Sequence, residues 1–310
     1  MFKFSTLLIA FLSYTQLLLA QKTNSPHTML WEVKDPRSYN VSYLFGTMHI
    51  FGESWLDSIT LVKDKFINAK HILIEGTITK DTENRIIDSF RKPYLGPAIL
   101  PRKIFSNKCF NIVNCYTKSI NWGDIDTLFH ENPQPIVVLS LLQWLLLNDY
   151  ASRFHIKTTE EDVLDHFFSK NANTKNREVT SLDNLYETVT NFIQNQNPKV
   201  LAKDIEELAN SLQKSDLTLS KYYNVIKNYK NLQYNYYFTK KAPRDDESDG
   251  SELTLRNNLW MPKLINAFNK DNCFVAVGIS HLNYKNGLIN QLKAAGFEVT
   301  PVEIKRIGLQ

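Results

Sequence analysis

The chain has 310 residues, of which 43% are hydrophobic and 22% charged, and this balance excludes a disordered or fibrous protein. The length suits one large α/β domain or two smaller ones. The net charge of +4 comes from 36 basic and 32 acidic residues that are spread along the chain without a basic run, so no nucleic-acid partner is predicted.

The first twenty residues differ from the rest of the chain. Lys3 precedes an apolar stretch, residues 4–20, that ends in the small residue Ala20. This order is typical of a secretory signal peptide, so we expect cleavage near Ala20, a mature domain over residues 21–310 and no stable membrane span afterwards. The product would be periplasmic or extracellular. The alternative is an N-terminal membrane anchor, because the stretch approaches the ~20 residues that span a bilayer.

Three cysteines are too few for a disulfide scaffold. An exported protein meets an oxidising compartment, in which Cys109 and Cys115 are the plausible pair. Cys273 lies in an apolar run, where a cysteine is usually a small buried side chain. The absence of a Cys-x-x-Cys spacing argues against a metal site built from these cysteines.

The N-terminal part of the mature chain predicts a strand, helix, strand order. Two strand-like runs, residues 30–33 and 43–45, flank a turn-forming segment at 35–38 and indicate a hairpin. Apolar residues then recur at helical spacing over residues 55–69. A short buried strand is expected at residues 72–74.

The C-terminal part repeats this order. Residues 273–277 and 298–304 predict strands, and residues 287–295 predict the helix between them. Gly296 stands where a C-cap glycine ends such a helix. Because a Gly-x-x-His pattern follows the first strand of each part, we interpret the two parts as a degenerate internal duplication.

The middle of the chain is predicted to be a mostly helical insertion, at about residues 136–241. Residues 136–147 are very apolar but too short for a membrane span, which favours a buried helix. Residues 160–237 show helical spacing, and their many tyrosines are expected to pack rather than to bind a peptide. Residues 243–252 are polar, acidic and contain a glycine, and therefore predict an exposed loop.

Polar residues follow three of the predicted strands. His49 and His281 end the two Gly-x-x-His patterns, and Glu75 ends the strand at 72–74. Ligands of α/β sheets collect beyond the carboxyl ends of strands, so these side chains are candidate ligands of zinc, cobalt or manganese. A bound divalent ion would activate water, and the hydroxyls of Thr47 and Ser280 would orient water or substrate.

Each of these features has a simpler interpretation. A single Gly-x-x-His occurs by chance, and an isolated histidine is more often structural; two copies in matched strand contexts favour function. Glu75 could be an exposed carboxylate at a strand end. Arg256 and Asn257 begin an amphipathic helix, where the arginine could clamp a carboxylate or stabilise an oxyanion, although a solvated pair at a helix start is the simpler interpretation.

Five segments of the sequence form an ordered set that is far more specific than any one member. They are residues 43–49 (YLFGTMH), 74–75 (IE), 255–264 (LRNNLWMPKL), 274–281 (FVAVGISH) and 287–302, with its GLI and KAAGFEVTPV. In this order they resemble the TraB/GumN family, which includes the Tiki proteins, and they span nearly the whole chain after the predicted signal peptide.

The resemblance implies a fold that is shared distantly with erythromycin-esterase-like and ChaN-like proteins. The predicted fold class is α/β (α+β), with a mixed central sheet formed by two pseudo-repeated strand-helix-strand halves and a mostly helical insertion between them. Tiki proteins associate the two Gly-x-x-His motifs and an acidic residue with metal-dependent peptide cleavage. By position, His49, Glu75 and His281 become metal or catalytic candidates, with Arg256 and Asn257 as supporting polar groups.

Two departures from the family pattern concern substrate and rate more than fold. The family often has Gly-Leu-Glu near the middle, whereas this chain has Ser-Leu-Asp at residues 181–183, so that Asp183 is one methylene shorter. Leu255 replaces the acidic residue that often precedes the Arg-Asn pair.

Three functions follow as hypotheses. The first is an exported metal-dependent hydrolase, peptidase-like, in which Glu75 binds the ion or moves the proton and Arg256 and Asn257 assist. The second is a non-catalytic protein that binds a peptide, haem or iron in the same crevice. The third is a structural accessory to surface polysaccharide export, motivated by the family name and the predicted signal peptide. Of these, the hydrolase hypothesis predicts a peptide or protein substrate.

Overall fold

The computed structural model describes most of residues 26–306, in two compact units that are treated separately below. One unit contains residues 79–156 and 185–223, and the other contains the described parts of 26–77, 163–184 and 224–306. The predicted signal peptide and nearly all of the predicted acidic loop lie outside the described residues. These are residues 26–77, 79–92, 98–131, 134–153, 155–156, 163–172, 177–195, 197–213, 221–242 and 252–306.

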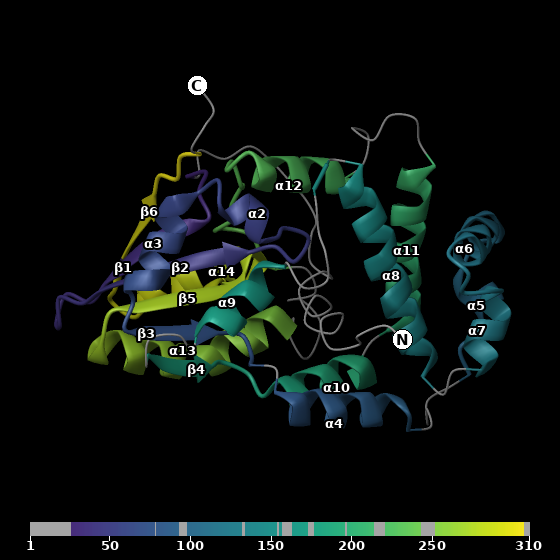
Figure 1. Cartoon of the computed structure of the whole chain (residues 1–310), viewed down its shortest axis with the longest axis horizontal. Helices are drawn as coiled ribbons and strands as arrows, with labels where there is room; N and C mark the ends of the chain where they lie inside the picture. The colour runs from purple at the N-terminus through teal and green to yellow at the C-terminus, as the bar shows by residue number, and fades with distance from the viewer. Residues whose placement is uncertain are drawn as a thin grey trace. The chain divides into compact units, whose positions relative to one another are not determined.

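A six-stranded sheet organises the second unit. Its order is β4-β3-β5-β2-β1-β6, so strands from both ends of the sequence are interleaved (Figure 1). The mixed α/β fold class is therefore confirmed, whereas the internal duplication stays a prediction. The strands are β1 (Leu30–Lys34), β2 (Val41–Thr47), β3 (His71–Ile74), β4 (Glu178–Ser181), β5 (Cys273–Gly278) and β6 (Glu298–Val302).

Strand direction determines where the functional residues gather. The predicted hairpin is confirmed, because β1 pairs antiparallel with β2. Strand β1 also pairs antiparallel with β6, while β2, β5, β3 and β4 run parallel to one another. The carboxyl ends of four neighbouring strands consequently meet at one edge of the sheet, which is where α/β proteins bind ligands.

Strand β4 lies within residues 160–237, a segment that was predicted to be mostly helical and whose described residues are mostly helical. The β-branched residues Val179 and Thr180 favour extended backbone, and β4 pairs in parallel with β3 over its whole length. A four-residue strand is too short to interrupt the helical spacing on either side of it, so the sequence did not indicate it. The strand matters for the site, because β4 brings residues 182 and 183 to the edge where β3 ends.

Two helices were predicted in the strand-helix-strand parts of this unit, and the structure interrupts one of them. The predicted helix at 55–69 is split into two pieces by a turn at residues 57–59, and the predicted C-terminal helix is confirmed. Residues 231–242 contain neither helix nor strand. The helices are α2 (Glu53–Leu56), α3 (Thr60–Asn68), α9 (Leu164–Ala172), α12 (Lys221–Lys230), α13 (Glu252–Lys270), α14 (Ile279–Leu282) and α15 (Leu288–Ala294).

Aromatic rings fill the space between the sheet and its helices. Phe168 of α9 packs against Phe45 of β2 and Phe274 of β5, with ring centroids 5.7 and 5.4 Å apart. Phe66 of α3 joins the same group at 5.1 Å from Phe168. Full burial of such side chains contributes about 1.5–3 kcal/mol each, so this cluster fixes α3 and α9 to the strands that carry the site.

Two glycines have clear geometric roles, and that of Gly296 was predicted. A Cβ on Gly46 would lie 2.1 Å from the Cδ1 atom and 3.0 Å from the Cα atom of Ile279, so only glycine lets α14 approach β2. Gly296 follows α15 with φ +91°, a conformation that favours glycine and that ends the helix as expected. The hydroxyl of Tyr229 donates to the Gly46 carbonyl at 2.7 Å, which supports the packing role predicted for the tyrosines.

The other unit contains helices joined by turns and irregular segments, with no strand among its described residues. Helices α8 and α11 lie side by side, as do α4 and α10 (Figure 1). Helix α8 confirms the buried apolar helix, and no described helix of the chain has both the length and the apolarity that a membrane crossing needs. The helices are α4 (Lys80–Phe90), α5 (Pro101–Ile104), α6 (Asn107–Ser119), α7 (Ile125–Glu131), α8 (Pro135–Ser152), α10 (Leu185–Asn195) and α11 (Pro198–Leu212).

The plausible cysteine pair is not joined in this structure, because Cys109 and Cys115 are both free. Both lie on α6, and six residues correspond to about one and two-thirds turns, which places the side chains on different faces. Cys109 is buried and Cys115 is exposed. Cys273 is free and buried, as expected for a small core side chain.

Candidate functional site

The ends of three parallel strands bring the predicted site residues to one edge of the sheet. Thr47 ends β2 and is paired in register with Gly278, which ends β5. Glu75 directly follows β3, the strand on the other side of β5. The chain continues from β2 to His49 and from β5 to His281 in α14, and the side chains of both histidines are buried. The structure thus gathers residues that lie more than 200 positions apart.

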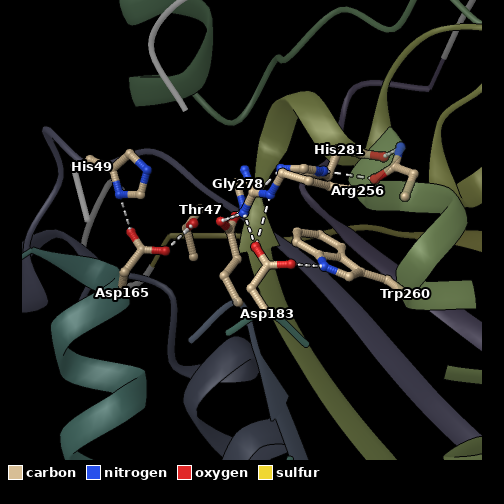
Figure 2. A network of polar contacts seen from close by, with 10 residues as sticks. Thr47, His49, Asp165, Asp183, Arg256, Trp260, Gly278 and His281 are labelled. Atoms are coloured by element: carbon tan, nitrogen blue, oxygen red, sulfur yellow. Dashed lines mark hydrogen bonds and ion pairs between the residues drawn. The ribbon is translucent and has the colours of Figure 1, made fainter. Parts of the chain in front are cut away.

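The first histidine is held by a carboxylate from α9. Nδ1 of His49 lies 2.6 Å from Oδ2 of Asp165, and the hydroxyl of Thr47 donates to Oδ1 of the same carboxylate at 2.8 Å. Burial opposes a charged imidazole, but the Asp165 carboxylate outweighs burial and raises the pKa of His49 above its usual value. Figure 2 shows this group on one side of the polar network.

Glu75 is held by opposite charge and by the backbone. Its Oε2 lies 2.6 Å from the Nη2 atom of Arg256, and its Oε1 accepts the Gly278 N–H at 2.5 Å. Burial favours the neutral carboxyl, but Arg256, His281 and His49 outweigh burial and lower the pKa of Glu75 to about 2. Glu75 is therefore ionised at neutral pH, and it is not the exposed strand-end carboxylate of the simpler interpretation.

Asp183 shares the same guanidinium. Its Oδ2 accepts from Nε of Arg256 at 2.8 Å and lies 2.7 Å from Nη2, while its Oδ1 accepts the indole N–H of Trp260. Burial raises the pKa of Asp183 above its usual value, against the opposing effect of Arg256. Arg256 therefore clamps two carboxylates and is not a solvated residue at a helix start.

The second histidine is oriented by an amide and an indole. The Asn257 side chain donates through Nδ2 to the carbonyls of His281 and Asn286, at 3.2 and 3.1 Å, which turns its Oδ1 towards Nδ1 of His281 at 2.7 Å. Nδ1 must then carry the proton, leaving the lone pair on Nε2. The ring also packs on Trp260 with centroids 4.2 Å apart. Burial and the charge of Arg256 lower the pKa of His281 to about 3, so the imidazole is neutral.

The charges around Glu75 do not balance among the buried side chains that the structure describes. Glu75 and Asp183 are two carboxylates on one guanidinium, that of Arg256, and the neutral His281 adds no charge. The imidazole–carboxylate pair at the first motif compensates itself. Since uncompensated charge is costly to bury, this arrangement favours the uptake of a proton or a cation.

One pair of atoms is suited to receive a cation. Nε2 of His281 is buried without a hydrogen-bond partner among the described residues, and it lies 3.9 Å from Oε1 of Glu75. Both atoms are electron-pair donors, and metal bonds of about 2.0–2.2 Å to each are compatible with that spacing. Within the described ranges no three His, Cys, Asp or Glu side chains form a group that could hold a metal ion. The structure thus offers two of the three predicted ligands together, and His49 faces Asp165 instead.

The hydroxyls that were expected to orient water or substrate differ in availability. The Thr47 hydroxyl is engaged by Asp165. The Ser280 hydroxyl is buried and has no hydrogen-bond partner in the described part of the chain. Of the two, Ser280 is therefore the residue with bonding capacity to spare for a ligand.

Two partners in this network were not identified from the sequence. Asp165 lies in the first turn of α9, and Trp260 lies one turn after Arg256 on α13. Asp165 carries no local signature, because its partners Thr47 and His49 are distant in sequence. For Trp260, the spacing of four residues from Arg256 was an available signal, since residues four apart share a helix face.

Comparison with known proteins gives one match. A family model described as TraB/PrgY/gumN family matches residues 29–301, which is most of the chain and includes every residue of the network. Neither the curated proteins nor the solved structures that were compared with the chain gave a match.

Proposed function

The chain belongs to the TraB/PrgY/gumN family, and from that premise we propose that it is an exported hydrolase of peptide bonds whose reactive centre is the His281–Glu75 pair. Export rests on the predicted signal peptide, and the peptide substrate rests on the resemblance to Tiki proteins. The chemistry rests on the contacts of the buried network.

The observation that carries the proposal is the lone pair on Nε2 of His281. It is buried, it has no hydrogen-bond partner among the described residues, and it faces a carboxylate oxygen of Glu75 at 3.9 Å. Asn257 fixes the tautomer, as is common for histidines that bind metal. His281 and Glu75 would hold a divalent ion, manganese, cobalt or zinc, which when bound supplies Lewis acidity and lowers the pKa of water.

The pKa values of Glu75 and His49 suit these two residues to different tasks. A general base works best with a pKa near the operating pH, so Glu75, with its pKa of about 2, is better suited to holding a ligand than to moving a proton. His49, whose pKa is raised, retains a proton at higher pH than free imidazole does. His49 is therefore our candidate proton donor to the leaving amine, and Asp165 stabilises its charged form.

The test is metal binding and peptide cleavage by matched histidine variants. Manganese, cobalt and zinc are each titrated into the chelator-treated wild type, into His281→Gln and into His71→Gln. His71 is a suitable control because it is buried at the start of β3, where its Nε2 lies 2.9 Å from the Thr180 hydroxyl, and not at the carboxyl ends of the strands. Cleavage is then measured with a library of quenched fluorogenic peptides.

We expect one ion per chain in the wild type and in His71→Gln, and loss of the ion in His281→Gln. Chelator should abolish cleavage, and the ion that binds should restore it. Equal ion affinity in both histidine variants, with each folded, would overturn the proposal.

A second function is favoured by the low exposure and the mutual pairing of the side chains in the network. The side chains of Glu75, Asp183, Arg256 and His281 are at most 10% exposed, and Arg256 pairs with both carboxylates, which suits binding without turnover. In this alternative the crevice holds haem, iron or a peptide. An intense visible absorption band on haem titration, together with no cleavage of any peptide, would favour it over the hydrolase.

A further inference from the structure

Asp183 is fixed at the end of the sheet by its own backbone. Its N–H donates to the carbonyl of Glu75 at 2.7 Å, continuing the parallel pairing of β4 with β3 by one step. The ammonium of Lys263 on α13 donates to the carbonyls of Leu182 and Ser181 just before it. Hydrogen bonds therefore hold the backbone at and just before Asp183 to the end of β3 and to α13.

The two oxygens of Asp183 serve different halves of the site. Oδ2 holds Arg256, whose Nη2 in turn holds Oε2 of Glu75 at 2.6 Å. Oδ1 accepts the indole N–H of Trp260, whose ring packs on His281. The same carboxylate thus controls the carboxylate end of the site through a guanidinium and the imidazole end through an indole (Figure 2).

These contacts form a loop around the gap between Nε2 of His281 and Oε1 of Glu75. Arg256 also lies over the Trp260 ring, with the guanidinium carbon 4.8 Å from the ring centroid. The guanidinium and the indole that Asp183 binds therefore also contact each other. We propose that Asp183 is a positioning residue that sets the spacing and orientation of Glu75 and His281. This inference rests on the proposed function, in which that pair is the reactive centre.

The chain offers matched variants for a test. Asp183→Asn keeps the size and an oxygen for the indole but removes the charge that holds Arg256. Asp183→Glu keeps the charge and both oxygens. Glu178→Gln makes the same carboxylate-to-amide change at the other end of β4, on an exposed residue that pairs with Lys270. Trp260→Phe removes the indole donor and keeps an aromatic face.

Two readouts separate positioning from a general structural role. The first is the nuclear magnetic resonance spectrum of the metal-free protein, labelled with ¹⁵N-histidine, which reports the tautomer of His281 and the ring-current shift from Trp260. The second is the affinity for Co²⁺ alone, measured by calorimetry. Circular dichroism and thermal unfolding establish that each variant is folded.

We expect Asp183→Asn to move the His281 ring signals towards their unstacked positions and to weaken Co²⁺ binding about 10- to 100-fold, the usual effect of removing a residue that supports a ligand. Asp183→Glu should retain more of the affinity, and Glu178→Gln should match the wild type. Trp260→Phe should shift the His281 signals while leaving Glu75 clamped, and it replaces Asp183→Asn if that variant does not fold.

The two proposals fail in different ways. If the wild type binds no Co²⁺, the proposed metal centre fails, but the His281 signals still test the role of Asp183. If Asp183→Asn, or Trp260→Phe in its place, leaves the His281 signals and the Co²⁺ affinity as in Glu178→Gln, then Asp183 does not position the pair, whether or not the protein is a hydrolase.

Discussion

The two Gly-x-x-His motifs follow neighbouring parallel strands, yet the pKa values of their histidines are shifted in opposite directions. His49 faces the carboxylate of Asp165, and its pKa is raised. His281 faces the amide of Asn257 and the ring of Trp260, and its pKa falls to about 3. One pattern in the sequence therefore gives one histidine whose pKa is raised and another whose pKa is lowered.

This difference arises from elements outside the motifs. The partner of the first histidine comes from α9 and the partners of the second from α13, and neither helix is part of the strand-loop pattern that the motifs share. Pairs of titratable groups whose pKa values are driven apart are the usual arrangement of an acid and a base in catalysis. The asymmetry between the motifs thus agrees with the division of tasks that we propose for the two histidines.

The largest effect should come from Arg256→Met. The change leaves Glu75 and Asp183 buried against each other without a counter-charge, and breaking such a cluster costs about 3–5 kcal/mol in the free energy of unfolding. It should also raise the pKa of His281, because Arg256 is one of the causes that lower it, and so reduce the contrast between the histidines. Chemical denaturation and histidine titration measure the two effects.

The control for this change is Arg91→Met. Arg91 pairs with Asp88 on the exposed surface of α4, where an ion pair contributes about 0–1 kcal/mol. A loss in Arg256→Met no greater than in Arg91→Met would show that the shared guanidinium does not stabilise the site.

A smaller effect is expected for Asp165→Asn, which makes the first motif resemble the second. Losing a charged partner costs about 1.5–3 kcal/mol, and the pKa of His49 should fall. Because the folded pKa of His49 is raised, its stabilising contribution is complete below the unfolded pKa and disappears as pH rises through the folded value. The destabilisation of Asp165→Asn relative to the wild type should therefore be greatest near pH 6 and smaller at pH 9.

The titration of His281 in the same variant provides an internal control. His281 is held by α13 and not by Asp165, so its signals should keep their wild-type pH dependence. A cost of Asp165→Asn that is equal at pH 6 and pH 9 would mean that His49 is neutral in the folded protein.

The sequence predicts the strands and the strand-end positions of the site residues better than it predicts the contacts between their side chains. The hairpin, the C-terminal strands and the strand-end placement of Glu75 and both histidines follow from local patterns, because burial and chain direction act over short stretches. The sequence shows that Asp183 differs from the family pattern, but its pairing with Arg256 depends on β4. That strand has only four residues and lies between segments with helical spacing, so the sequence does not predict it. Asp165 and Trp260 act through distant partners, which no local pattern reports.

Gly46→Ala tests the contact between the two motifs themselves. The added Cβ would lie 2.1 Å from Cδ1 and 3.0 Å from Cα of Ile279, so α14 must shift and the cost should be about 1–3 kcal/mol. Because α14 carries His281, its ring signals should move as well. Adding Ile279→Val removes the Cδ1 atom and should restore part of the stability; no restoration would point to a cost elsewhere at Gly46.

The smallest effect compares the hydroxyls of the two motifs. Thr47→Val removes a hydrogen bond to Asp165 and leaves that carboxylate short of a donor, which should cost about 0.5–1.5 kcal/mol. Ser280→Ala removes a hydroxyl that has no hydrogen-bond partner among the described residues, so the free energy of unfolding should change by less than about 0.5 kcal/mol. If Ser280 instead contacts a ligand, Ser280→Ala should weaken Co²⁺ binding or peptide cleavage while leaving stability intact. A stability loss in Ser280→Ala equal to that in Thr47→Val would show that its hydroxyl serves the fold, and that the motifs differ less than their contacts indicate.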